Sequence, residues 1–181
     1  MTILITGATG NVGRNVVDQL VQRGANVRAL VRDPAKANLP AQVEVVQGDL
    51  LDVDALRAAF SGISTLFLLN AVVPDEFTQA LLTLGVAREA GVKRVVYLSV
   101  IHSDVYVNVP HFAGKFGVER MIEAMGFNAT VLRPAYFMDN EITIIETDGS
   151  SGEAQEQRAR RLFKELARNI GREAVKHLKS M

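Results

Sequence analysis

The chain has 181 residues, 48% of them apolar, and its acidic and basic side chains balance to a formal net charge of zero. This length and composition predict one folded domain with a full core and exclude an intrinsically disordered chain. A neutral chain offers no electrostatic argument for nucleic acid or a membrane as partner, and we expect neither. Cysteine is absent, which excludes disulfides, zinc–thiolate sites and thiol catalysis. We therefore expect a cytoplasmic protein without a bound metal.

Short β-branched runs alternate with longer amphipathic stretches along most of the chain. We predict strands at residues 2–6, 26–31, 43–47, 65–69, 94–99 and 129–133, and helices near residues 11–23, 52–60, 75–90 and 111–125. Several of these strands are apolar almost throughout, which is typical of strands covered on both faces. The alternation therefore predicts an α/β fold with a doubly wound parallel sheet of six to seven strands and helices on both faces.

Single residues at the ends of these segments support the boundaries. Gly24 and Gly91 follow predicted helices, where glycine readily takes the left-handed backbone conformation of a C-cap. Asp52 precedes a helix that it can cap, and Pro110 suits the first turn of the next helix.

The composition changes after residue 140. Residues 142–146 predict a further strand, and residues 153–180 a charged amphipathic helix that Gly171 interrupts. We expect this helix to cover one face of the sheet, so that residues 1–140 form the ligand-binding domain and residues 141–181 pack on it. A partner-binding or membrane-surface helix is the alternative. The apolar positions of the helix recur every three or four residues, at Ala159, Leu162, Phe163, Leu166, Ile170, Ala174 and Leu178.

A glycine-rich turn joins the first predicted strand to the first helix. Gly7 permits the tight turn, Gly10 lets the backbone approach a pyrophosphate, and Gly13 lets the helix pack closely on the strand. The N–H groups at the start of the helix, with the positive end of its dipole, then hold the phosphates. This context predicts a dinucleotide-binding Rossmann domain, the alternative being a tight turn without a ligand. The expected contacts also include Thr9, Asn11 and Val12.

The end of the second strand bears on which dinucleotide is bound. NAD-binding Rossmann domains carry an acidic residue there for the ribose 2′-hydroxyl, whereas this chain has Arg32 followed by Asp33. A guanidinium at this position can pair with a 2′-phosphate, and Lys36 is a candidate second cation. We therefore predict NADP(H) rather than NAD(H). In the alternative, Arg32 is solvated and Asp33 binds the ribose.

Further candidates lie where later strands end. Asp49 and Leu50 follow the third strand, where Asp49 could accept a hydrogen bond from adenine or cap the next helix. Asn70 and Ser99 end the fourth and fifth strands, at the sheet edge where open α/β sheets bind ligands.

His111 and Lys115 lie four residues apart, and so on one face of the predicted helix that follows the fifth strand. Lys115 can hydrogen-bond ribose hydroxyls and hold the nicotinamide, and His111 could donate a proton near neutral pH. We name both as candidate catalytic residues. The alternatives are a solvated lysine and a surface histidine.

With these residues in view, the chain resembles the NmrA-like branch of the atypical short-chain dehydrogenase/reductases. The resemblance covers residues 1–140 and rests on TGATGNVG (6–13), VRDPAKA (31–37), GDLLD (48–52), FLLN (67–70), GVKRVVYLSV (91–100), HFAGKFGVERMIE (111–123) and TVLRPAYFMDN (130–140). It implies phosphate contacts at residues 7–13, a 2′-phosphate contact at Arg32 and a nicotinamide contact at Lys115. It also implies either an NAD(P)H-dependent quinone or dye reductase, or a redox sensor that binds NADP without turnover.

Two departures from that family bear on function. His111-x-x-x-Lys115 stands where classical members carry Tyr-x-x-x-Lys, so the usual proton donor is absent. Residues 141–181 do not resemble the family's substrate-binding part, which leaves an engineered or chimeric origin open beside a natural one. The first hypothesis is hydride transfer from NADPH to a quinone or small carbonyl acceptor. The second is a non-catalytic NADP sensor or a truncated Rossmann scaffold. The glycine spacing and Arg32 argue against a methyltransferase.

Overall fold

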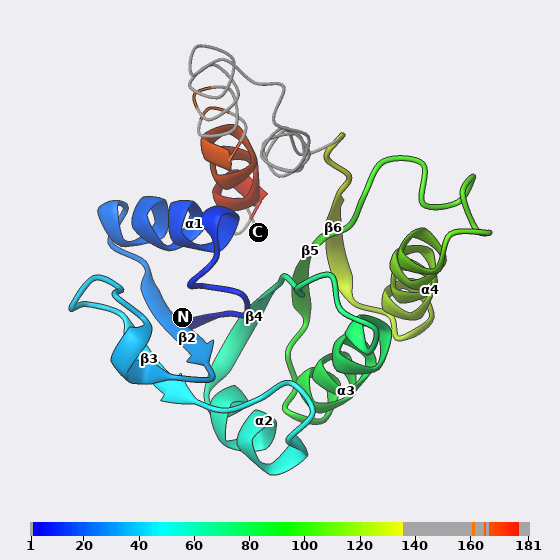
Figure 1. Cartoon of the computed structure of the whole chain (residues 1–181). Helices are drawn as coiled ribbons and strands as arrows, with labels where there is room; N and C mark the ends of the chain where they lie inside the picture. Colours follow the sequence, from blue (N-terminus) through cyan, green and yellow to red (C-terminus); the bar gives the residue numbers. More distant parts are fainter. Residues whose placement is uncertain (1, 136–160, 162–164, 166, 178–181) are drawn as a thin grey trace.

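The computed structural model describes residues 2–135, 161, 165 and 167–177. Within this part of the chain, six parallel strands form one sheet in the order β3-β2-β1-β4-β5-β6 (Figure 1). The strands are β1 (Thr2–Ile5), β2 (Asn26–Val31), β3 (Glu44–Gln47), β4 (Ile63–Leu68), β5 (Arg94–Leu98) and β6 (Asn128–Leu132). The helices are α1 (Asn11–Gln22), α2 (Val53–Phe60), α3 (Glu76–Glu89) and α4 (Pro110–Ala124), with a 3₁₀ turn, η1 (Pro34–Lys36). This strand order confirms the doubly wound fold.

The boundaries predicted from the sequence hold to within two residues for all six strands and four helices. Gly24 and Gly91 have positive φ angles of 69° and 78°, as predicted for the ends of their helices. The Asp52 carboxylate accepts hydrogen bonds from the amides of Asp54 and Ala55, so it caps α2 as predicted. The turn η1 was not predicted. The further strand predicted at residues 142–146 lies outside the described residues.

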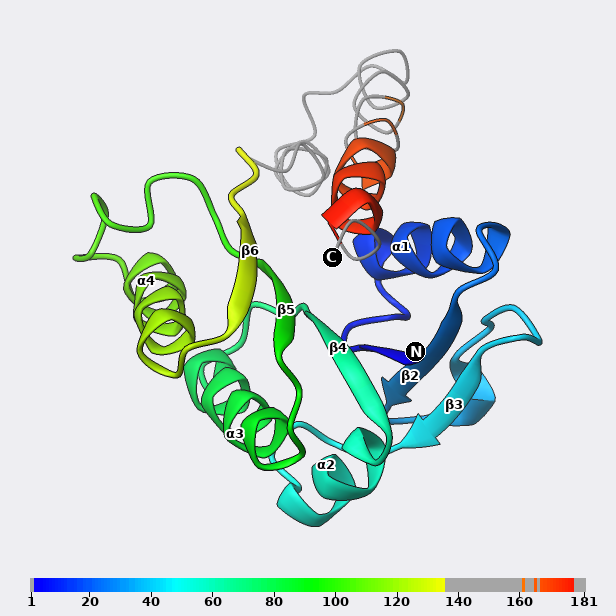
Figure 2. The ribbon, with the colours of Figure 1, turned by 180° about the vertical axis from the view of Figure 1, so that it is seen from behind.

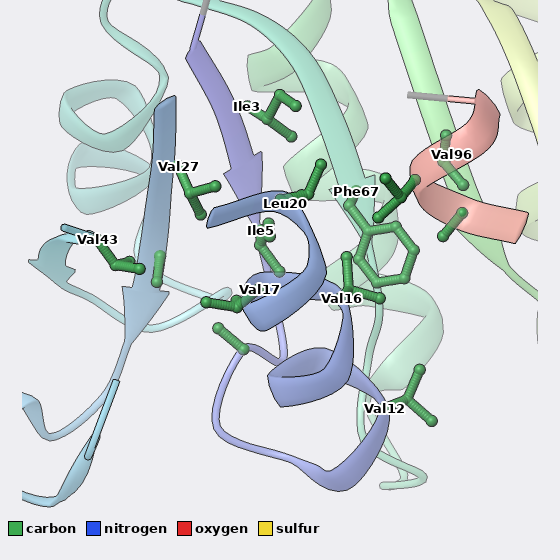
Figure 3. Packing of buried hydrophobic residues seen from close by; sticks show 14 of the residues in the cluster. Ile3, Ile5, Val12, Val16, Val17, Leu20, Val27, Val43, Phe67 and Val96 are labelled. Carbon is green, nitrogen blue, oxygen red and sulfur yellow. The ribbon is translucent and has the colours of Figure 1, made fainter. Parts of the chain in front are cut away.

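Helices cover both faces of the sheet (Figures 1 and 2). One face packs against α2, α3 and α4 in a core that includes Leu56, Phe60 and Leu84. The other face packs against α1 and the helical residues 167–177. Figure 3 shows the second core from close by, with Val16, Val17 and Leu20 of α1 lying over the strands. Burial of both faces explains why the central strands β1, β4 and β5 are largely apolar, whereas the edge strand β3 is mostly exposed and carries Glu44 and Gln47.

Helical residues 167–177 pack into the same core as α1, and Gly171 does not interrupt them. Ala167, Ile170, Ala174 and Val175 are buried in the core cluster that α1 also contributes to, and residues 167–177 are continuously helical. A Cβ atom on Gly171 would lie 2.5 Å from Nε2 of Gln19 in α1. The backbone of Asn15 in α1 would lie 3.5 Å from the same Cβ atom, so the two helices run close together here, and packing on α1 accompanies the helical conformation of Gly171 in spite of its weak helix propensity. The other apolar positions predicted on this face lie outside the described residues.

No helix in the described ranges has both the length and the apolar content to cross a membrane.

Candidate functional site

The strand order reverses between β1 and β4, because the chain builds the sheet outward in one direction from β1 and in the other from β4. Thr6 joins the two strands where they end. Its hydroxyl donates to the carbonyl of Leu69 and accepts from the amide of Leu69, both at 2.9 Å. Ligands of doubly wound sheets bind in the crevice at such a reversal, outside the carboxyl ends of the strands.

A cavity of about 470 Å³ opens at this point. Its wall combines the glycine-rich turn, the ends of β2, β3 and β4, and the start of α3. Nine predicted binding residues line it, namely Gly7, Thr9, Gly10, Asn11, Val12, Arg32, Asp49, Leu50 and Asn70. Gly48, Val73, Gln79 and Leu98 are among the lining residues that were not predicted.

The three glycines of the turn have different neighbours. Gly7 has a φ of 65°, and a Cβ there would lie 2.9 Å from Leu69. A Cβ on Gly13 would lie 2.0 Å from the carbonyl oxygen of Gly7, so Gly13 serves the packing of α1 and lies outside the cavity wall. A Cβ on Gly10 would meet only the Gly7 oxygen, at an ordinary 3.5 Å. Packing within the described residues therefore does not require glycine at position 10, which faces the cavity.

The first turn of α1 suits an anion. It contains no acidic residue, and no side chain caps it. The positive end of the helix dipole therefore acts at the cavity without a carboxylate beside it.

At the end of β2, Arg32 lines the cavity while Asp33 is engaged elsewhere. The Asp33 carboxylate accepts from the amide of Ala35 at 3.1 Å and pairs with Lys36 at 3.0 Å. These bonds hold the Asp33 carboxylate at η1. They therefore argue against the alternative in which Asp33 binds a ribose. Lys36 does not line the cavity, and its side chain is 86% exposed.

Asp49 lies in the cavity wall, where its carboxylate accepts from the amide of Leu51 at 2.9 Å. The alternative in which Asp49 caps the next helix is wrong, because Asp52 makes both capping bonds. Asn70 is 5% exposed, and its amide nitrogen donates to Gln79 at 3.5 Å. Its Oδ1 has no hydrogen-bond partner in the described structure. A buried acceptor left in this way can take a donor from a ligand.

Neither His111 nor Lys115 lines the cavity, because both turn toward Glu76 at the start of α3. The Nδ1 atom of His111 lies 2.6 Å from Oε1 of Glu76, and Nζ of Lys115 lies 3.8 Å from Oε2. Lys115 also donates to the carbonyl oxygen of Leu98 at 3.3 Å. Lys115 is 4% exposed, so the solvated-lysine alternative is wrong. Burial lowers the pKa of Lys115, although the negative charge of Glu76 opposes that effect.

Ser99 also lies outside the cavity wall, in a second polar cluster. Its hydroxyl donates to Glu119 at 2.5 Å, and Ser103 donates to the same carboxylate at 3.2 Å. Arg133 donates three hydrogen bonds to Glu119, from Nε at 3.0 and 3.2 Å and from Nη2 at 2.6 Å. Burial raises the pKa of Glu119, but the hydrogen bonds from Arg133 and Ser99 outweigh burial and bring the pKa below its ordinary value.

Sequence reasoning missed Glu76, Glu119 and Arg133. Glu119 lies one helical turn beyond Lys115, which is a local signal that could have drawn attention to it. Glu76 carries no comparable signal. Within the described ranges, no group of three or more metal-ligating side chains is placed to hold an ion.

Comparison with known proteins adds independent information. The model of the NmrA-like family matches residues 1–159. The NAD(P)H azoreductase of Xenophilus azovorans is 32% identical over 155 residues, covering 83% of this chain and 54% of that protein. The NADPH-dependent quinone oxidoreductase of Escherichia coli in complex with NADPH gives a TM-score of 0.72 at 32% identity, covering 80% and 53% of the two chains. Citrobacter sp. triphenylmethane reductase complexed with NADP(H) gives 0.72 at 30% identity, covering 78% and 52%. The chain thus spans about half the length of these proteins.

Proposed function

The chain belongs to the NmrA-like family, and from that premise we propose that it binds NADP(H) at the β1–β4 reversal and reduces a quinone or a small carbonyl compound. The observation that carries the proposal is the cavity in which the glycine-rich turn and Arg32 meet. The absence of cysteine fits a reducing compartment, and we place the protein in the cytoplasm.

The residues present fit the dinucleotide in three respects. Gly10 leaves space beside the start of α1, where a pyrophosphate would meet backbone N–H groups. Arg32 supplies a guanidinium for a 2′-phosphate, while the neighbouring Asp33 is held by η1. Asn70 supplies the unpartnered acceptor at the end of β4. NADPH, when bound, supplies the hydride.

Arg14 links the two segments that would bind the phosphates, the glycine-rich turn and the loop after Arg32. Its Nε donates to the carbonyl oxygen of Thr9 at 2.8 Å and its Nη2 to that of Ala37 at 3.4 Å. One guanidinium thus ties the glycine-rich turn to the loop that follows Arg32. This tie limits the relative movement of the two segments and reduces the ordering cost of binding.

The test is a calorimetric titration with NADPH and NADH. Loss of the charge-assisted bonds in Arg32→Ala costs about 1.5–3 kcal/mol, or about ten- to 150-fold in NADPH affinity. The NADH affinity should change little. Lys93→Ala is the matched control. It removes one exposed cation just before β5, at the amino ends of the strands and therefore away from the cavity at their carboxyl ends. Equal losses for both dinucleotides in Arg32→Ala would remove the 2′-phosphate assignment.

A second candidate function is NADP(H) binding without turnover. It is favoured by the position of His111 and Lys115, which lie behind the cavity wall rather than in it. Loss of NADPH absorbance in the presence of quinones would support the reductase. Saturable NADPH binding without oxidation by any quinone or carbonyl acceptor would support the binding module.

A further inference from the structure

The buried carboxylate of Glu76, at the start of α3, contacts two titratable side chains of α4, those of His111 and Lys115. We call Glu76, His111 and Lys115 the Glu76 cluster. The Glu76 side chain is only 9% exposed and lies 2.6 Å from Nδ1 of His111 and 3.8 Å from Nζ of Lys115. A carboxylate so far from water is costly unless cations or donors face it. One lysine and one imidazole face this carboxylate, and its Oε2 atom accepts no hydrogen bond within the described structure.

The cluster touches the cavity wall at two places. Lys115 donates to the carbonyl oxygen of Leu98, and Leu98 lines the cavity. The amide of Glu76 donates to the carbonyl oxygen of Val73 at 3.1 Å, and Val73 also lines the cavity. A change in the cluster therefore reaches the ligand-facing surface through two direct hydrogen bonds.

We propose that Glu76 is a positioning residue of this site, whose carboxylate keeps the ring proton of His111 on Nδ1 and holds the ammonium of Lys115 against the Leu98 carbonyl. An ionised carboxylate only accepts hydrogen bonds, so the Nδ1 atom beside it must carry the proton. No hydrogen bond joins Nε2 of His111 to any residue in the described ranges, so Nε2 is the ring atom available to a substrate that binds beside this face of α4, outside the cavity wall. That consequence rests on the proposed reductase function. The positioning itself does not.

The charge of Lys115 depends on the same carboxylate. Burial lowers the pKa of Lys115, while the negative charge of Glu76, 3.8 Å from Nζ, raises it. From β5, the ring of Tyr97 lies 5.2 Å from Nζ, and burial, followed by the charges of Glu76 and Glu119, raises the pKa of Tyr97 far above its ordinary value. Tyr97 therefore stays neutral beside the lysine. Glu119, on the same helix as Lys115, is itself paired with Arg133. Glu76 is thus the anion that supports the Lys115 ammonium.

Two NMR measurements on the protein without cofactor test the proposal. The first is the ¹⁵N spectrum of the imidazoles in the wild type, with the His111 signals assigned by their loss in His111→Gln. We expect a protonated Nδ1 in the neutral ring. A neutral ring protonated on Nε2 overturns the proposal, and this measurement does not require any Glu76 variant to fold.

The second measurement follows the titration of the Lys115 Cε signal, assigned with Lys115→Arg. In Glu76→Gln the carboxylate becomes an amide of nearly the same shape, so the midpoint should fall by about one pH unit or more. Glu89→Gln is the control, because it makes the same change at an exposed position of the same helix, and it should leave the midpoint in place. An unchanged midpoint in Glu76→Gln overturns the proposal.

Turnover separates this inference from the proposed function. If the wild type oxidises NADPH with a quinone, Glu76→Gln should lower kcat at least about tenfold, because the imidazole and the ammonium lose their orientation. Glu89→Gln should retain wild-type kcat. If the wild type shows neither NADPH binding nor turnover, the proposed function fails, and the two NMR measurements still decide the role of Glu76.

Discussion

Two glycines of the β1–α1 turn should respond to alanine in opposite ways, since one serves packing and the other faces the cavity. In Gly13→Ala the new methyl carbon would lie 2.0 Å from the oxygen and 2.7 Å from the carbon of the Gly7 carbonyl. Ordinary carbon contacts begin at about 3.5 Å, so the backbone must move by about 1.5 Å. Overpacking costs about 1–3 kcal/mol, and backbone neighbours put this variant near the upper end. The free energy of unfolding should fall accordingly.

Gly10→Ala should leave the fold intact. Gly10 has φ −78° and ψ 170°, which alanine adopts readily, and a methyl carbon there would meet only the Gly7 oxygen at 3.5 Å. We expect the free energy of unfolding to change by less than about 0.5 kcal/mol. The methyl group would instead keep a pyrophosphate from the backbone. Loss of one charge-assisted hydrogen bond, about 1.5–3 kcal/mol, lowers NADPH affinity about tenfold or more.

Denaturant unfolding and calorimetric titration of both variants separate the two effects. We expect Gly13→Ala to lose stability, and Gly10→Ala to lose NADPH affinity at wild-type stability. Comparable destabilisation by the two variants would refute the assignment of separate roles within the turn. Wild-type NADPH affinity in Gly10→Ala would refute the placement of the pyrophosphate at this turn.

Three further predictions concern the framework around the site. Arg133→Met should cost about 3 kcal/mol because it leaves the Glu119 carboxylate buried, whereas Glu119→Gln should cost less because the half-exposed guanidinium is hydrated. Since the folded pKa of Glu119 lies below its ordinary value, this stability is complete above that ordinary pKa and disappears as pH falls through the lowered one, as urea unfolding at several pH values would show. Gly171→Val should lower the unfolding temperature, because its branched methyl groups would meet the Asn15 backbone of α1, which lies only 3.5 Å from the Cβ position, and unchanged melting would count against that contact. Asp52→Ala should cost about 1 kcal/mol in denaturant unfolding, since two amides lose their acceptor, and a neutral result would contradict its role as a cap.

The fold was predictable because its signals are local. Apolar strands, helix-ending glycines and the Asp52 cap each act within a few residues, and the same physics sets the structural boundaries. The cavity wall was predictable for a related reason. The carboxyl ends of parallel strands lie at one edge of the sheet. Arg32, Asp49 and Asn70 therefore come together there independently of the conformation of the loops.

The Glu76 cluster could not be predicted, because its contacts depend on how α3 packs against α4. Thirty-five positions separate Glu76 from His111, and no periodic pattern links them. Sequence reasoning placed His111 and Lys115 on one helix face but could not show what that face would meet. Gly171 illustrates the same limit, since low helix propensity suggested a break where the helix continues and lies close to α1.

The proposed binding residues and the Glu76 cluster lie mainly in different halves of the sheet. The β1–β2–β3 half carries the glycine-rich turn, Arg32 and Asp49, which suit the phosphates and the adenosine. The other half carries the Glu76 cluster. Helices α3 and α4 follow β4 and β5 and bring Glu76 to His111 and Lys115. Thr6 joins the halves through its bonds to Leu69. Substitutions in the glycine-rich turn or at Arg32 should therefore change affinity for the dinucleotide, and substitutions in the Glu76 cluster should change proton transfer and turnover. This division allows binding to persist where catalysis is lost, and it makes affinity and turnover separate measurements for each variant.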